Sequence, residues 1–364
     1  MNQCPQTDNS PEVSLLVPIY NAERYLEQCL RSALGQTLDD IEIIAINDGS
    51  TDDSGRILES FAERDRRLRV IEKPNSGYGA SLNCGLATAR GEYVAVLEAD
   101  DWMEADALAS LLHHARRGDA QVVRGNYWHY WSAPRERNVL QRVVPEGFIG
   151  QTIDPARHSE LFSITPSIWA GLYRRDLLEE NAIRFLESPG ASYQDTAFAF
   201  KVWAAARRVL LLRAAFVHYR QDNEDSSVKS EAKVFCVMEE FAEVARFLRE
   251  DRPDLLERLA GVLLREKLRA YLWNLDRLSP AARPQFLSVA HDDLAGDVAA
   301  GHLNESLLRP WHLCELKALL KDPIWFLTLR ASRSGGPASR VRYYYELGGA
   351  PLVARVAWGA LVGH

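Results

Sequence analysis

Four short, continuous runs of apolar residues recur along the first hundred residues, and they constrain the fold of this chain more than any other feature. The runs VSLLVPIY, IEIIAIND, LRVIE and YVAVL occupy residues 13–20, 41–48, 68–72 and 93–97. Because they are apolar throughout rather than alternating, they predict strands buried on both faces. Helical patterns fill the intervals, at residues 22–36, 54–65 and 77–89. This rhythm predicts an α/β fold with a doubly wound, mostly parallel, Rossmann-like sheet.

Polar, turn-forming residues follow each run. Ligands of such sheets bind beyond the carboxyl ends of the strands, so these tips predict one binding crevice. The tips are Pro18 to Asn21, Asp48 to Ser50, Lys73 to Gly77 and Glu98 to Asp101. Each tip alone also has a structural explanation, as a turn with a helix N-cap or as a glycine-rich helix entry. The exposed amides of a glycine-rich entry would also suit a phosphate.

Acidic residues gather at the end of the fourth run, at Glu98, Asp100 and Asp101. Carboxylates this close repel one another unless a positive charge lies among them. Mg²⁺ would supply that charge, since it prefers one or two carboxylates together with phosphate oxygens. The alternative is that loops are polar and helices favour acidic N-caps. This segment alone leaves both explanations open.

Length and charge narrow the class of protein. The chain has 364 residues, more than one core of about 250 residues fills, so we expect two domains or one domain with an extension. A net charge of -7 argues against nucleic-acid binding as a main function. The three-glycine dinucleotide fingerprint is absent after the first run, which argues against a dehydrogenase.

Cysteine usage and hydropathy favour a cytoplasmic location. The five cysteines are scattered and form no CxxC pair, as expected for reduced thiols. The first dozen residues show no secretory signal, and no stretch reaches the roughly 20 apolar residues of a membrane-spanning helix. We therefore expect a cytoplasmic protein.

Three ordered segments carry a resemblance to a known family. They are VSLLVPIYNAERYLEQCLRSALGQT, IAINDGSTDDS and NSGYGASLNCGLATARGEYVAVLEADD. Together they resemble the nucleotide-binding half of the bacterial, inverting GT-A-type glycosyltransferases of family 2. The resemblance implies a GT-A fold, a nucleoside diphosphate sugar as donor, most commonly a UDP-sugar, and Mg²⁺ or Mn²⁺ as cofactor.

The resemblance also implies roles for single residues. Donor contacts fall on Pro18, Tyr20, Asn21, Glu23, Asp48, Lys73, Asn75, Gly77, Asn83, Glu98 and Asp100. Asp48 matches the acid that hydrogen-bonds the base, and Asp100 matches the acid that binds the metal on the diphosphate. Glu98 stands where the family more commonly has Asp, which moves its carboxylate outward by one methylene.

Two later segments match the sugar and acceptor side of the family's site. PSIWAGLYRRDLL places Trp169 beside the sugar, with Ala170-Gly171 where members often have Asn-Lys. SYQDTAFAFKVWAAA places Asp195 at the position of the catalytic base, after Gln194 in place of the usual Glu. Inverting transfer needs one such carboxylate to take the proton of the attacking hydroxyl. The structural alternative for Asp195 is a helix N-cap, and both roles can hold at once.

The end of this region supplies candidates for the diphosphate and the metal. Residues 120–126 and 209–219 read as strands, with a loop expected at 127–131. Many relatives have a flexible loop after the second strand that closes over the diphosphate. Arg220 could neutralise phosphate charge, and His218 or Asp222 could reach the metal. A solvated polar loop is an equal alternative for each of these residues.

The last third changes to helical periodicity punctuated by prolines. We expect a flexible N-terminus at residues 1–12, a catalytic domain at 13–230, a helical extension at 231–320 and a basic aromatic tail at 321–364. The extension could serve acceptor binding or homo-oligomerisation. The tail holds six basic against two acidic residues, which suits peripheral contact with an anionic membrane face. The alternative is that its aromatic residues complete the helical core.

These observations predict a metal-dependent inverting glycosyltransferase. It would move a sugar to a saccharide or lipid-linked acceptor, in the assembly of surface polysaccharide or glycoconjugate. Two alternatives remain. One is a degenerate transferase fold that only binds nucleotide sugars. The other is a sugar nucleotidyltransferase, although its glycine-rich, basic loop after the first strand is missing.

Overall fold

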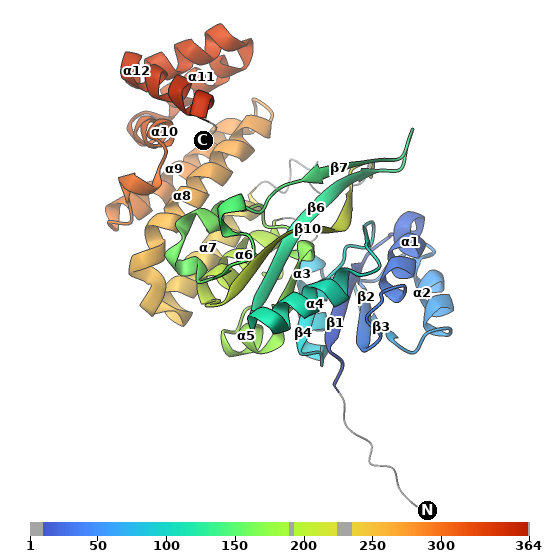
Figure 1. Cartoon of the computed structure of the whole chain (residues 1–364). Helices are drawn as coiled ribbons and strands as arrows, with labels where there is room; N and C mark the ends of the chain where they lie inside the picture. Colours follow the sequence, from blue (N-terminus) through green and yellow to red (C-terminus); the bar gives the residue numbers. More distant parts are fainter. Residues whose placement is uncertain (1–9, 189–192, 224–234, 363–364) are drawn as a thin grey trace, which may run out of the picture. The chain divides into compact units, whose positions relative to one another are not determined.

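A computed structural model describes residues 10–188, 193–223 and 235–362. Its contacts divide the chain into two compact units, Met1–Lys229 and Ser230–His364. The strands all belong to the first unit, and the second is helical in its described residues (Figure 1). Most of the expected flexible N-terminus, residues 1–9, and most of the expected loop over the diphosphate, residues 224–234, lie outside the described residues.

One ten-stranded sheet forms the centre of the first unit. Its order is β3-β2-β1-β4-β9-β6-β10-β5, with β7 added to β6 and β8 added to β10. The strands are β1 (Val13–Ile19), β2 (Ile41–Asn47), β3 (Leu68–Glu72), β4 (Tyr93–Val96), β5 (Trp102–Met103), β6 (Val122–Trp131), β7 (Arg137–Gln141), β8 (Thr152–Ile153), β9 (Gly171–Arg174) and β10 (Val209–Arg220). The first four strands run parallel, as do β6 and β10, and β9 is antiparallel to both of its neighbours. The predicted α/β class is therefore confirmed.

Helices cover both faces of this sheet, because β1 carries large apolar side chains on each face. Leu15 packs in one core with α1 (Glu23–Leu34), α2 (Ser54–Ala62) and α4 (Ala107–Gly118). On the other face, α3 (Tyr78–Thr88) comes so close that a Cβ on Gly85 would lie 3.1 Å from the side chains of Leu16 and Ile46. Two shorter helices complete the unit, α5 (Arg175–Glu180) and α6 (Gln194–Ala205).

The third expected strand differs from the other three. β1, β2 and β4 are buried at every residue, whereas β3 buries only Leu68. β3 forms the edge of the sheet, so a helix covers it incompletely. Burial on both faces was wrong for this strand, although its bounds were right.

The loop expected after residue 126 is instead strand. β6 continues to Trp131 and turns back as β7, pairing Tyr127 with Gln141 and Trp131 with Arg137. Aromatic residues favour strands because their rings pack against cross-strand neighbours. The local aromatic content was thus a strand signal.

The second unit consists of helices in its described residues. These are α7 (Cys236–Arg246), α8 (Pro253–Arg277), α9 (Arg283–Ala299), α10 (Pro310–Lys321), α11 (Pro323–Ala331) and α12 (Pro337–Val362). Every one after α7 carries a proline in its first turn. Proline suits the first turn because the amide that it lacks has no partner there. α12 is interrupted at Gly348 and Gly349, which leave helical geometry.

The aromatic residues of the tail divide between the core and the surface. Phe326 and Tyr343 are fully buried, and the Tyr343 hydroxyl donates to Glu315 over 2.6 Å. Arg330 forms a buried ion pair of 2.8 Å with the same Glu315. In contrast, Trp325 and Trp358 are 41% and 71% exposed. Completion of the helical core therefore holds for Phe326 and Tyr343, and membrane contact by the tail stays a prediction.

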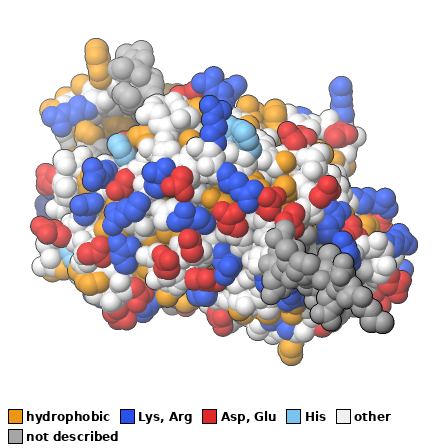
Figure 2. Space-filling view, turned by 60° about the horizontal axis from the view of Figure 1, so that its bottom comes forward, with side chains coloured by type: hydrophobic (Ala, Val, Ile, Leu, Met, Phe, Trp, Pro, Cys, Tyr) orange, Lys and Arg blue, Asp and Glu red, His pale blue; other side chains and the backbone are white. Residues whose placement is uncertain are grey.

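No described helix is both long enough and apolar enough to cross a bilayer. On the face shown in Figure 2, basic and acidic side chains are interspersed rather than sorted into areas of one sign.

Candidate active site

Hydrogen bonds join the loops that follow β1 and β2. The amide of Asn21 donates to Ser50 Oγ over 3.0 Å, and Asn21 Oδ1 accepts from the amide of Thr51 over 2.8 Å. Asn21 has φ 48°, a left-handed conformation that Asn tolerates better than most residues. Glu23 Oε2 accepts from the amide of Asp53 over 2.8 Å. Asn21 and Glu23, two of the expected donor contacts, thus organise the loops that form this edge.

Asp48 shapes the loop that follows β3. It is 4% exposed, and its carboxylate accepts from the amides of Ser76 and Gly77, each over 2.9 Å, and from the ammonium of Lys73. Gly77 has φ 94°, a conformation that requires glycine. The structure therefore brings three expected donor residues, Asp48, Lys73 and Gly77, into one contact.

Three other expected donor residues lie at the same edge. Pro18 is buried near the end of β1, Asn75 is exposed, and Tyr20 is 53% exposed. Tyr20 is thus placed to present its ring to solvent beside the joined loops.

Asn83 faces another part of the chain. Its amide donates to Phe185 O and Glu187 Oε1, each over 2.9 Å, and its Oδ1 accepts from the amide of Phe185 over 2.9 Å. These bonds fix the segment before α6 against α3. In this structure the Asn83 side chain therefore supports the segment before α6.

The acidic residues after β4 form the centre of the site. Glu98 and Asp100 are half-buried and Asp101 is 1% exposed. Burial, and then repulsion by Asp100 and Asp195, raise the pKa of Glu98 to about 8. The Tyr78 hydroxyl opposes this rise by donating to Glu98 Oε1 over 2.5 Å. The structure thus brings Asp195 into the field of the acids after β4, about a hundred residues earlier in the chain.

Arg220 locks the acidic loop in place. Its Nε donates to the carbonyl of Asp100 over 2.8 Å, and its amide donates to Asp101 Oδ1 over 2.8 Å. Its guanidinium also donates to Gln28 over 2.6 Å and lies 4.2 Å from the ring centre of Tyr25. With these partners Arg220 positions the acids, rather than offering an unengaged cation to a phosphate.

The two further metal candidates are engaged elsewhere. Both ring nitrogens of His218 have partners, Asn138 Oδ1 at 2.7 Å and Glu104 Oε1 at 2.9 Å, and the ring stacks on Trp102. Asp222 Oδ2 accepts from the amide and hydroxyl of Ser132 and from the amide of Ala133, and these bonds lower the pKa of Asp222 to about 2 despite partial burial. The ligand atoms of both residues are thus engaged in hydrogen bonds within the protein, and metal binding by Asp100, His218 or Asp222 stays a prediction.

Asp195 lies in the first turn of α6 and is half-buried. Burial raises its pKa to about 6, while its own amide, nearby Arg124 and Thr196 work against that rise. The N-cap position of α6 is Tyr193, and the Asp195 carboxylate accepts hydrogen bonds from its own amide and from Thr196. Asp195 is therefore ionised at neutral pH and remains basic enough to accept a proton.

Arg124 is a residue that the sequence interpretation missed. It lies on β6, is 2% exposed, and donates to Ser167 Oγ over 2.6 Å and to the carbonyl of Thr165. Its Nε is buried and has no hydrogen-bond partner among the described residues. The available signal for a functional residue was a single arginine within the apolar run AQVVRGN, because an arginine is rarely buried in a strand unless it has a partner.

Aromatic rings line the remaining side. Trp169 packs against Tyr219 with ring centres 5.0 Å apart, and against Tyr127 at 4.6 Å. Burial raises the pKa of Tyr219, and the charges of Asp101, Asp100, Glu98 and Asp195 raise it further. The charges of all four acids therefore act on Tyr219, which its place within an expected strand did not reveal.

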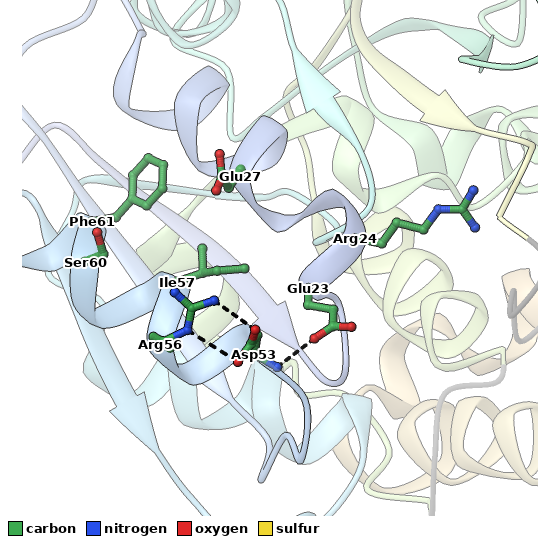
Figure 3. A pocket seen from close by; sticks show the side chains of 8 residues that line it. All are labelled: Glu23, Arg24, Glu27, Asp53, Arg56, Ile57, Ser60 and Phe61. Atoms are coloured by element: carbon green, nitrogen blue, oxygen red, sulfur yellow. Dashed lines mark hydrogen bonds and ion pairs between the residues drawn. The ribbon is translucent and has the colours of Figure 1, made fainter.

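A charged surface pocket lies apart from these acids, between α1 and α2 (Figure 3). Ile57 and Phe61 contribute its apolar lining, and Arg56 pairs with Asp53 at its rim over 2.8 Å. Glu23 is its one residue among the expected donor contacts.

The acidic centre suits a divalent cation that has further ligands from a diphosphate. Asp100 Oδ2 accepts from Asn223 over 2.8 Å, and Asp101 Oδ2 is buried without a hydrogen-bond partner among the described residues. No group of three or more His, Cys, Asp or Glu within those residues forms a complete protein cage. An open site with one or two carboxylates is what Mg²⁺ uses when it binds phosphates.

Comparison with solved structures supports the fold. TarS 1-349 of S. aureus, solved in complex with UDP-GlcNAc, aligns with a TM-score of 0.69 and 22% identity, covering 88% of this chain and 91% of that chain. At this identity the likeness shows the architecture alone.

Comparison with known sequences identifies the family. The family model described as Glycosyl transferase family 2 matches residues 14–181. An uncharacterized glycosyltransferase, EpsJ of Bacillus subtilis, is 33% identical over 58% of this chain and 62% of its own length, so the chain spans less than two thirds of that relative. Glycosyltransferase GlyG of Streptococcus pneumoniae is 41% identical over 57% of this chain and 70% of its own length. On these matches, and with the fold described above, the chain belongs to glycosyltransferase family 2.

Proposed function

We propose that the chain is an inverting glycosyltransferase that moves a sugar from a nucleoside diphosphate sugar to an acceptor hydroxyl. The observation that carries this proposal is that the charges of Asp100 and Asp195 both raise the pKa of Glu98. Glu98 and Asp100 follow β4, whereas Asp195 lies at the start of α6. A degenerate binding module would have no need to keep these acids together, because carboxylates that lie close together repel one another.

In this proposal, Asp195 is the base. It accepts the proton of the acceptor hydroxyl while that oxygen attacks the anomeric carbon and the bond to the diphosphate oxygen breaks. The nucleoside diphosphate leaves with the electron pair of that bond. A pKa of about 6 suits a base that works near neutral pH. Arg124, which helps to keep Asp195 ionised, is a positioning residue.

Asp100 is the residue that would hold the metal. A bound Mg²⁺ or Mn²⁺ would offset the charge that develops on the departing diphosphate. Arg220 fixes the backbone of Asp100 and Asp101, so the carboxylates are arranged before the ligand arrives.

The joined loops after β1, β2 and β3 would receive the nucleoside. Asp48 holds the amides of Ser76 and Gly77 in one direction, and Tyr20 is exposed beside them. We propose a UDP-sugar as the first donor to test, since the similar TarS was solved with UDP-GlcNAc. Surface polysaccharides or glycoconjugates are the proposed products, on the basis of the family resemblance.

A donor panel tests this function. Thermal unfolding with UDP-, GDP-, dTDP- and CMP-sugars, with and without Mn²⁺, should show a rise in Tm for one nucleotide class, because a ligand of the native state stabilises it. Release of free sugar from that donor should be slow in the wild-type protein and lower still in the Asp195→Asn variant. Donor binding without any sugar release or transfer would favour the degenerate module, and failure of every donor to bind would contradict both functions.

We also propose peripheral membrane contact through α11 and α12. Its support is the exposed Ile324, Trp325 and Trp358, which are 78%, 41% and 71% exposed. Arg340 and Arg355 on α12 are exposed and would meet anionic headgroups.

A further inference from the structure

Three aromatic side chains of β6 share one face of the β6–β7 hairpin. Tyr127, His129 and Trp131 alternate along the strand, so they point to the same side. The ring centres of Tyr127 and His129 are 5.7 Å apart, and those of His129 and Trp131 are 6.0 Å apart. Tyr127 is buried, whereas His129 and Trp131 are half-buried and keep exposed surface.

The same face continues to the acids. Tyr219 on β10 lies beside His129 with ring centres 6.0 Å apart, and Trp169 follows at 5.0 Å from Tyr219. Both are half-buried. Trp169, Tyr219, His129 and Trp131 therefore form a chain of neighbouring rings, which we call the aromatic row. Its inner end adjoins the acids, because Tyr219 directly precedes Arg220, whose amide donates to Asp101 Oδ1 over 2.8 Å.

The outer end of the row carries polar donors. The guanidinium of Arg137 lies 3.8 Å from the ring centre of Trp131, its cross-strand partner. Arg137 is exposed, and Val139 beside it is 40% exposed. An arginine held flat on a ring keeps its N–H groups directed outward.

The opposite face of β6 behaves differently. Trp128 and Tyr130 pack against His218, and the His218 ring also stacks on Trp102. Of these rings, Tyr130 and His218 are buried, and Trp128 and Trp102 are half-buried. The half-buried rings of the aromatic row are thus not needed for the packing on the other face of the strand.

We propose that the aromatic row is the acceptor site and that it binds a saccharide of two or more sugar units. The proposal rests on the proposed function. The attacking hydroxyl of the first unit lies between Trp169 and Asp195, and the following units stack along Tyr219, His129 and Trp131. The C–H faces of pyranose rings pack on aromatic rings, while sugar hydroxyls accept hydrogen bonds from Arg137 and His129.

The chemistry of the row favours a saccharide over other acceptors. Successive ring centres lie 5.0 to 6.0 Å apart, and the ring planes turn along the row, by 33° between Trp169 and Tyr219, 60° between Tyr219 and His129 and 86° between His129 and Trp131. Each ring therefore offers a separate contact to one unit of a sugar chain. An acyl chain would need a continuous apolar surface, whereas imidazole and guanidinium interrupt this one.

An oligosaccharide array tests the proposal with the full-length protein. Probes are neutral gluco-, galacto- and N-acetylglucosamine oligosaccharides, graded from monosaccharide to hexasaccharide. We expect the wild-type protein to bind at least one series more tightly as the chain lengthens. Trp131→Ala should weaken the longer members by about tenfold and leave the monosaccharide at its wild-type signal.

Matched variants keep this test decisive. Trp273→Ala is the control, since Trp273 on α8 also carries a stacked arginine, Arg277 at 4.1 Å, and is 51% exposed. It should bind as the wild type does. If Trp131→Ala fails to fold by circular dichroism, the exposed Arg137→Ala variant takes its place, with an expected loss of a few-fold for the longer members. Wild-type protein that binds no series, or a variant that keeps the wild-type dependence on length, overturns the proposal.

Nucleotide binding separates this inference from the function on which it rests. The same wild-type sample is titrated with UDP-GlcNAc and with the other nucleotide sugars of the donor panel. Nucleotide binding without saccharide binding overturns the acceptor site alone. Absence of nucleotide binding overturns the proposed function.

Discussion

The hydroxyl of Tyr78, at the start of α3, donates to Oε1 of Glu98 over 2.5 Å. Family members more commonly carry Asp at this position, and an Asp side chain would be one methylene shorter. The longer glutamate therefore has a specific partner in this chain. The contact also links α3 to the loop that carries the metal candidate, Asp100.

Removing the Tyr78 hydroxyl should weaken the site and the fold. We expect Tyr78→Phe to lower the free energy of unfolding by about 1–3 kcal/mol, since a half-buried acid loses its donor. Urea unfolding at neutral pH measures this change. Tyr20→Phe is the matched control, because the 53% exposed Tyr20 should change stability by less than about 0.5 kcal/mol. Equal effects of the two variants would contradict the role of the Tyr78 contact.

Gly79 should tolerate no side chain. A Cβ at Gly79 would lie 2.1 Å from the carbonyl oxygen of Leu186, so α3 or the segment before α6 must move. We expect Gly79→Ala to destabilise the protein by about 2–4 kcal/mol through overpacking. Gly296→Ala is the helical control, because Gly296 has open space around its Cβ position, and it should raise stability by up to about 1 kcal/mol. Thermal and urea unfolding compare the two variants.

Asp195→Asn should separate binding from turnover. The amide cannot take the proton of the acceptor hydroxyl, so kcat should fall by about 10²–10⁴. Donor affinity, measured by calorimetry, should stay within a few-fold of the wild-type value. Loss of donor binding with little loss of kcat would contradict the assignment of Asp195 as the base.

The pH dependence gives an independent check on the same residue. Because burial raises the pKa of Asp195 to about 6, kcat should increase through that pH and level off above it. A raised pKa means that the native state binds the proton more tightly than the unfolded state. Its stabilising contribution is complete below the unfolded pKa, about 3.9, and is lost as the pH rises through about 6. Asp195→Asn should therefore be more stabilising at pH 8 than at pH 5.

Asp100→Ala should weaken the metal-dependent part of donor binding. In the wild-type protein we expect Mn²⁺ to tighten nucleotide binding, since the cation bridges the carboxylate and the phosphates. The variant should bind the nucleotide equally with Mn²⁺ and with EDTA. Calorimetric titrations under both conditions measure this difference. A variant that keeps the full effect of Mn²⁺ would show that the cation binds elsewhere.

Membrane contact can be tested on the exposed apolar residues of α11 and α12. Co-sedimentation with phosphatidylglycerol vesicles should be clear for the full chain and strongly reduced for the Ile324→Ser, Trp325→Ser, Trp358→Ser triple variant. Higher salt should weaken the wild-type binding, because arginines contribute through charge. Trp273→Ser is the control for a general effect of losing an exposed ring. Negligible binding of the wild type would remove the proposal.

Local pattern was enough to predict the sheet, because residues such as Leu15 and Leu16 must be buried on opposite faces of one strand. The bounds of the first four strands follow from this requirement within one residue. The apolar pattern could not show that β3 is an edge strand with exposed residues, since the burial of a strand depends on which helices pack against it. It also missed the β6–β7 hairpin, where cross-strand pairs such as Trp131 and Arg137 decide the structure.

For the candidate site, too, part could be predicted from the sequence and part depended on the tertiary structure. The sequence by itself determined the family, and it singled out Asp100 and Asp195 as candidates because both stand in ordered motifs that resemble family 2 glycosyltransferases. Only the tertiary structure decided what surrounds them. It fixed both nitrogens of His218 in other bonds, turned Arg220 toward the backbone of Asp100, and brought Tyr219 within reach of the charges of the acids. Hydrogen-bond partners and local fields depend on distances between residues far apart in the chain, and those distances exist only after the strands pair and the helices pack.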